Sequence, residues 1–250
     1  DRSQTVRSML SNGQPAGSAP RALIVPHAGY VYSGPVAATA YSQLIPFKYN
    51  YRRVVLLGPC HRVPLSGLAS SSADTFRTPL GDVPLDRRLI AALDSPFVVV
   101  SEEAHRLEHS LEVQLPFLQT VLGKFTLVPL VVGDTAPENV ATVIESLWNE
   151  PGTLTVVSSD LSHYLPYEEA RHRDRATCSA IEQLAGGRIR HGDACGASTV
   201  SGLLLVASRC GLTARTLDLR SSGDTAGGKD QVVGYGSWIL EEGASCGLAA

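Results

Sequence analysis

The sequence predicts an α/β protein, a three-layer α/β/α sandwich with a mostly parallel or mixed central sheet. The first observation is a series of short, continuously apolar runs such as Ala22–Val25 and Arg53–Leu57, which are typical of strands buried on both faces. The second is that helical segments separate these runs. The third is composition, since 44% of the 250 residues are hydrophobic and 18% are charged. A sheet covered by helices on both sides accounts for all three observations.

Apolar periodicity and turn residues place the expected elements along the chain. Strands are expected where short apolar runs are bounded by turn residues, at residues 22–25, 53–57, 97–100, 125–132, 154–157, 212–219 and 231–240. Helices are expected where apolar residues recur every three or four positions, at residues 34–44, 86–93, 107–122, 137–148, 168–184 and 198–210. Residues 65–85 are expected to form a hairpin-bearing insertion, and the glycine-rich residues 223–228 a loop.

The helix expected over residues 107–122 rests on leucines spaced by three and four, with a kink where Pro116 interrupts them. No repeat or linker divides the chain, so we expect one domain over residues 1–250. The first residue is Asp1 rather than Met, which indicates a truncated N-terminal segment.

Charge and cysteine content exclude several classes of function. The chain has 21 basic and 24 acidic residues and no basic tract, so we expect no nucleic-acid partner. No apolar run reaches the roughly 18 residues that a membrane span needs, so we expect no membrane segment. The cysteines form no CxxC pair, which favours free thiols and a reducing cytoplasm; they are Cys60, Cys178, Cys195, Cys210 and Cys246.

Three of the expected strands end in residues that bind metals or move protons. His27 follows the first strand, His61 the second, and Asp160 and His163 the strand at residues 154–157. Ligand sites in such sheets gather beyond the carboxyl ends of the strands. Each histidine alone is more often a hydrogen-bonded loop residue, but three such strand ends together favour a site.

Cys195 lies just before an apolar helix and is followed by Gly196. A helix N-terminus lowers the pKa of a thiol, and a glycine permits close approach, so Cys195 is a candidate ligand. The alternative is a buried, inert thiol. Glu108 and Glu112 would share one face of the expected helix. They form either a solvated face or a second layer of residues that orients metal-bound imidazoles.

Five ordered motifs resemble the Memo family, whose bacterial and archaeal members are also called AmmeMemoRadiSam system protein B. They begin at Pro26, Leu57, Glu108, Val157 and Ala194, and read PHAGYVYSG, LGPCH, EHSLE, VSSDLSH and ACG. The resemblance implies a fold similar to that of the class III extradiol dioxygenases. It also implies a metal site at His27, His61 and Cys195, with Asp160 and His163 beside it. Cys60 stands where serine is common in the family.

The expected cofactor is one mononuclear transition metal, Fe(II) or Cu, with Zn as an alternative because a thiolate also suits zinc. Asp160 and His163 are the candidate catalytic acid and base. Tyr30, Tyr32, Glu108 and His109 are expected around the metal or in the substrate pocket.

Three functions remain open. They are an O₂-dependent oxidoreductase, a non-catalytic metal-binding or protein-interaction module, and a zinc-type hydrolase. The expected ligand is a small molecule or peptide, and the family name suggests a radical-SAM protein as a partner.

Overall fold

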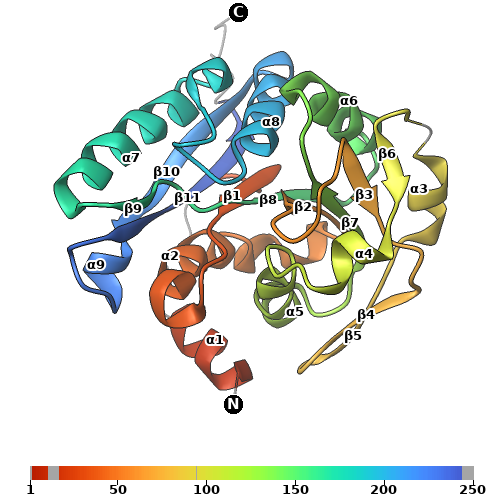
Figure 1. The fold of residues 1–250 in the computed structure, drawn as a ribbon. Helices are drawn as coiled ribbons and strands as arrows, with labels where there is room; N and C mark the ends of the chain where they lie inside the picture. Colours follow the sequence, from red (N-terminus) through yellow and green to blue (C-terminus); the bar gives the residue numbers. More distant parts are fainter. Residues whose placement is uncertain (1, 11–16, 94, 244–250) are drawn as a thin grey trace, which may run out of the picture.

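The computed structural model describes residues 2–10, 17–93 and 95–243. Within these ranges, nine strands form one mixed sheet in the order β10-β11-β1-β8-β2-β7-β3-β6, with β9 paired to β11 (Figure 1). Its four central strands run parallel and are β1 (Ala22–Val25), β8 (Thr153–Ser158), β2 (Arg53–Pro59) and β7 (Thr126–Val132). Their carboxyl ends therefore meet at one edge of the sheet.

Antiparallel strands extend this parallel centre on both sides. On one side β11 pairs with β1, β10 and β9, and on the other β3 pairs with β7. The last strand, β6, lies parallel to β3. A separate two-stranded hairpin confirms the predicted insertion. These strands are β3 (Leu68–Ser70), β4 (Thr75–Thr78), β5 (Gly81–Pro84), β6 (Val98–Val100), β9 (His163–Leu165), β10 (Leu212–Ser221) and β11 (Val232–Glu242).

Helices cover both faces of the sheet (Figure 1). One layer contains α6 (Pro137–Trp148), α7 (Tyr167–Glu182) and α8 (Ala197–Arg209), and the other contains α1 (Arg2–Leu10), α2 (Tyr30–Ser42) and α5 (Leu115–Leu122). The shorter helices are α3 (Arg87–Ala92), α4 (Glu102–Arg106), α9 (Ser222–Thr225), η1 (Ile45–Asn50), η2 (Glu112–Gln114) and η3 (Gly186–Arg188).

The core consists of two apolar clusters, one on each side of the sheet. In β1, Ala22 and Ile24 belong to the cluster under α6 and α8, whereas Leu23 and Val25 belong to the cluster under α2 and α5. This alternation explains why the central strands are continuously apolar, because both of their faces are buried. The three-layer α/β/α architecture predicted from the sequence is confirmed.

The single helix predicted over residues 107–122 is wrong. Helix α4 ends at Arg106, and α5 begins only at Leu115. Pro116 lies in the first turn of α5, where its missing N–H needs no partner, whereas inside a helix it would clash with the preceding turn. Glu108 and Glu112 consequently share no helix face. Three α-helices in the described ranges were not predicted at all: α1, α4 and the short α9 at the start of the glycine-rich loop.

Candidate metal centre

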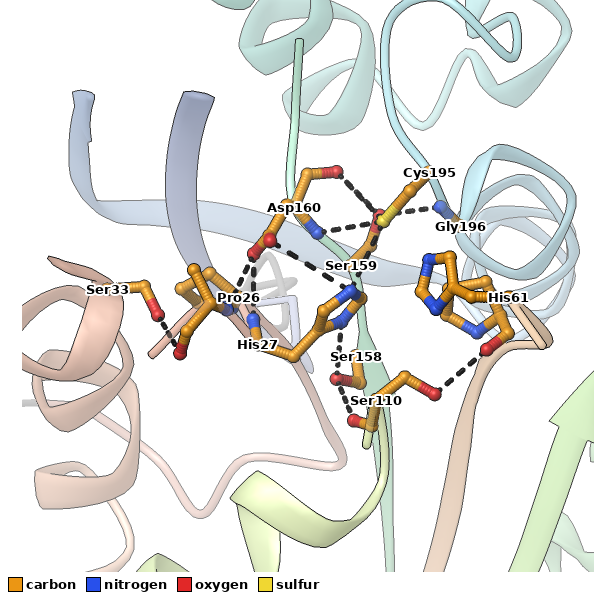
Figure 2. Close-up of polar contacts among 12 residues, drawn as sticks. Pro26, His27, Ser33, His61, Ser110, Ser158, Ser159, Asp160, Cys195 and Gly196 are labelled. Carbon is orange, nitrogen blue, oxygen red and sulfur yellow. Dashed lines mark hydrogen bonds and ion pairs between the residues drawn. The ribbon is translucent and has the colours of Figure 1, made fainter. Parts of the chain in front are cut away.

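The carboxyl edge of the parallel strands brings three candidate ligands together. His27 follows β1, His61 follows β2, and Cys195 precedes α8; their ligand atoms all lie within 4.8 Å of one another (Figure 2). The His27 Nε2 atom is 3.5 Å from the Cys195 Sγ atom. Tetrahedral bonds of about 2.0 Å to nitrogen and about 2.3 Å to sulfur would place these atoms about 3.5 Å apart. The donor set and its spacing therefore fit one mononuclear metal ion.

A buried hydrogen-bond network sets the tautomer of His27. The Ser158 hydroxyl donates its one proton to the Ser110 carbonyl oxygen at 2.6 Å, so it must accept from His27 Nδ1 at 3.0 Å. Gln114 Nε2 also donates to this hydroxyl, and Tyr41 donates to Gln114 Oε1. The imidazole proton is thus held on Nδ1, which leaves the Nε2 lone pair facing Cys195.

Glu108 sets the tautomer of His61 in a different way. Its carboxylate accepts from His61 Nδ1 at 3.1 Å and from the backbone amides of His61, His109 and Ser110 at 2.6, 2.9 and 2.9 Å. The carboxylate only accepts, so His61 carries its proton on Nδ1 and its Nε2 lone pair is free. His61, Glu108 and His109 also form a second group with ligand spacing. In that group Glu108 already receives four donors, so it orients His61 rather than binding a metal.

Cys195 is tied to the end of β8 by reciprocal backbone contacts. Its amide donates to the Asp160 carbonyl oxygen at 3.2 Å, and the Asp160 amide donates to its Sγ atom at 3.3 Å. The Gly196 amide donates to the Ser159 hydroxyl at 2.9 Å. A Cβ atom on Gly196 would lie 2.9 Å from Ser159, so only glycine permits this approach. The Cys195 position therefore depends on the crossing of two distant segments.

Burial controls the protonation of the metal-free site. Desolvation lowers the pKa of His27, although the Asp160 carboxylate acts in the opposite direction. Burial first, and Asp160 second, raise the pKa of the Cys195 thiol to about 12. The expectation that the helix N-terminus lowers this pKa is wrong for the metal-free chain, because desolvation outweighs it. A bound cation would supply the charge that a buried thiolate needs and would release the thiol proton.

The predicted acid and base lie in different surroundings. Asp160 Oδ1 accepts from the backbone amide of His27 at 2.7 Å, and Oδ2 lies 3.9 Å from His27 Nε2 (Figure 2). His163 instead contacts the Leu161 carbonyl oxygen through Nδ1 at 2.8 Å. The ring that packs at the site is that of His109, with its centroid 5.9 Å from His27 and 5.7 Å from His61.

Two cavities are lined by histidines of the site. One of about 400 Å³ is lined by His61 and Cys195. Another of about 290 Å³ is lined by His109 and Tyr30, whose hydroxyl donates to the Val113 carbonyl oxygen at 2.9 Å. Tyr30 therefore lines the same cavity as His109. Tyr32 is 40% exposed and lines neither cavity.

Other features of the sequence analysis can also be placed. Cys60, Cys178, Cys195 and Cys210 are free, and Cys246 lies outside the described residues. Among the helices in the described ranges, none combines the length and apolar character needed to cross a bilayer.

Comparison with known proteins supports the motif-based resemblance. The model of a family described as Memo-like protein matches residues 2–239. A MEMO1 family protein of Methanosarcina barkeri is 38% identical over 231 residues, covering 87% of this chain and 85% of the relative. One from Sulfolobus acidocaldarius is 34% identical over 240 residues, covering 90% and 84%.

A solved structure shares the fold at low sequence identity. An uncharacterised protein from Escherichia coli K12 superposes with a TM-score of 0.58 and 15% identity. The match covers 90% of this chain and all of that chain. With the family match over nearly its whole length and relatives above 30% identity, this chain belongs to the Memo-like protein family.

Proposed function

We propose that this protein binds one mononuclear iron(II) or copper ion through His27, His61 and Cys195, and oxidises a small molecule with O₂. The observation that carries the proposal is the cluster of three ligand atoms within 4.8 Å. Both imidazoles hold their proton on Nδ1, so each offers Nε2 to the metal. A thiolate is a soft donor that suits copper, zinc and thiolate-tolerant iron. When bound, iron or copper supplies redox chemistry toward O₂, which these side chains alone do not provide.

The cavities support a role beyond metal storage. Three protein ligands leave coordination positions open, and the cavity of about 400 Å³ gives access to them beside His61 and Cys195. Asp160 and His163 remain our candidates for moving protons, and the structure adds His109. A cytoplasmic location suits the proposal, because Cys195 must stay reduced to bind the metal.

Metal analysis of protein purified without oxygen tests the ligands. We expect one iron or copper ion per chain in the wild type, and a metal content at least tenfold lower in His27→Ala, His61→Ala and Cys195→Ser. His172→Ala, on the exposed surface of α7, is the matched control and should keep the full content. Wild-type stoichiometry in all three ligand variants would show that the site assignment is wrong.

Oxygen uptake and hydrolysis assays test the reaction. Iron or copper with O₂ consumption supports the oxidoreductase, whereas tight metal binding without turnover supports a metal-binding module. Zinc with ester or amide turnover would replace the proposal by a hydrolase. His163→Ala and His109→Ala should keep the metal, and the variant that loses turnover identifies the proton carrier. Loss of metal from either variant would instead identify that histidine as a ligand.

A further inference from the structure

The cavity of about 400 Å³ beside His61 and Cys195 extends to the N-terminus of α8. Ser198 and Thr199, in the first turn of this helix, line the cavity, and His191 also contributes to it. A molecule that reached the metal through this cavity would therefore contact the first turn of a 13-residue helix.

The first turn of α8 leaves backbone donors unused. Its N-cap is Gly196, which has no side chain to accept from them, and the first helical bond is from the Val200 amide to the Gly196 carbonyl oxygen at 2.8 Å. Within the described part of the chain, the amides of Ser198 and Thr199 have no hydrogen-bond acceptor. Such amides at the positive end of a helix dipole attract anions.

The Thr199 hydroxyl provides a second, independent indication. Thr199 is only 1% exposed, yet its hydroxyl has no hydrogen bond to any residue in the described ranges. The hydroxyl oxygen is nevertheless not completely sealed from solvent. We infer that the small exposed area of this oxygen faces the cavity, because Thr199 lines it. A buried hydroxyl is rarely left unpaired, so a partner is expected to come from the occupant of the cavity.

The charges around the cavity favour a carboxylate. A divalent ion held by one thiolate and two neutral imidazoles keeps a net positive charge, which adds to the helix dipole. Among the described residues that line the cavity there is no lysine or arginine, which a phosphate dianion would need. Asp134 also lines the cavity, but it is exposed, so water screens its charge.

We propose that the ligand of this cavity is a small molecule with a carboxylate group, bound by the amides of Ser198 and Thr199 and by the Thr199 hydroxyl. The inference rests on the proposed function, because it names the class of molecule that is brought to the metal. Three donors match the two oxygens of a carboxylate, and the cavity volume suits a ring or short chain attached to it.

Calorimetric titration with benzoate tests this proposal in metal-free and in zinc-loaded protein. We expect benzoate to bind both forms and its neutral analogue benzamide to bind at least tenfold more weakly. Thr199→Val should weaken benzoate binding about 10- to 100-fold, because a hydrogen bond to a charged group is lost. Thr199→Ser should restore it, and the same isosteric change at the exposed Thr142, on α6, should have no effect.

The outcomes separate this proposal from the metal assignment. Equal binding of benzoate and benzamide, or unchanged benzoate binding by Thr199→Val, would overturn it. Benzoate that binds only zinc-loaded protein, with no loss in Thr199→Val, is coordinated by the metal; this result would overturn the carboxylate site and leave the proposed metal site standing. Tighter binding of phenyl phosphate than of benzoate would overturn the choice of a carboxylate. If benzoate binds metal-free protein but the ligand variants keep their metal, the anion site stands and the metal assignment fails.

Discussion

The two histidines of the candidate metal centre are oriented by different means. The side chain of His27 is 3% exposed, and its ring is held by the neutral hydroxyl of Ser158. The side chain of His61 is 32% exposed, and its ring is held by the carboxylate of Glu108. Each arrangement holds the imidazole proton on Nδ1 and leaves Nε2 as the candidate ligand atom, so the same tautomer is reached with and without a charged partner.

Ser158 and Glu108 differ in the number and kind of hydrogen bonds that each forms besides the one to the imidazole ring. The buried Ser158 hydroxyl accepts from His27 and Gln114 and donates to the Ser110 carbonyl oxygen. Gln114 Nε2 also donates to the Pro26 carbonyl oxygen, so loss of this hydroxyl would leave fewer groups unpaired than loss of Glu108. Glu108 is a buried carboxylate that accepts three backbone amides in addition to the ring, so it also holds the loop that follows α4. We therefore expect Glu108 to matter most for stability and Ser158 mainly for metal affinity.

Glu108→Ala should have the largest effect on folding. It would leave the amides of His61, His109 and Ser110 without the buried carboxylate that accepts from them, which costs about 3–5 kcal/mol. Urea unfolding of the metal-free protein measures this loss. Glu112→Ala, four residues away and exposed, is the control and should change stability by no more than about 0.5 kcal/mol. A loss below about 1 kcal/mol for Glu108→Ala would show that the carboxylate does not hold this loop.

Ser158→Ala should have an intermediate effect, seen mainly in metal binding and less in folding than Glu108→Ala. Without the hydroxyl, His27 Nδ1 loses its acceptor, and changes of this kind lower metal affinity about 10- to 100-fold. Competition with a chelator of known affinity measures the change. Ser146→Ala removes a hydroxyl that contacts only its own helix and serves as the control. Affinity within about twofold of the wild type would mean that the tautomer of His27 is set by another group.

The parts of the site that lie at strand ends could be predicted from the sequence. His27 and His61 each follow a recognisable apolar run. The carboxyl ends of parallel strands meet at one edge of the sheet, so these residues come together there irrespective of loop conformation. Glu108 was also expected near the imidazoles, although on a helix that does not form. Leucine spacing describes only local periodicity, and it did not show that Pro116 starts a new helix.

The remaining features depend on contacts between distant segments. The network that orients His27 joins Tyr41, Gln114 and Ser158, and no local pattern links these positions. One signal was available, because Gln114 lies among leucines of a buried segment, where an uncharged polar residue indicates a specific hydrogen bond. Cys195 was placed by the family resemblance, since its position depends on the approach of Gly196 to β8. The proposed radical-SAM partner stays a prediction.

Cys60→Ser should have the smallest effect, although Cys60 is next to His61 in the chain. Its Sγ atom donates to the Val63 carbonyl oxygen at 3.3 Å, a bond that serine can also make, and it is not part of the ligand cluster. We expect full metal content and a change in the free energy of unfolding of no more than about 1 kcal/mol. The metal content of Cys60→Ser is compared with that of Cys195→Ser, because both variants replace one sulfur atom by oxygen. If Cys60→Ser lost metal and Cys195→Ser kept it, the thiolate ligand would be Cys60 and the assignment of Cys195 would be wrong.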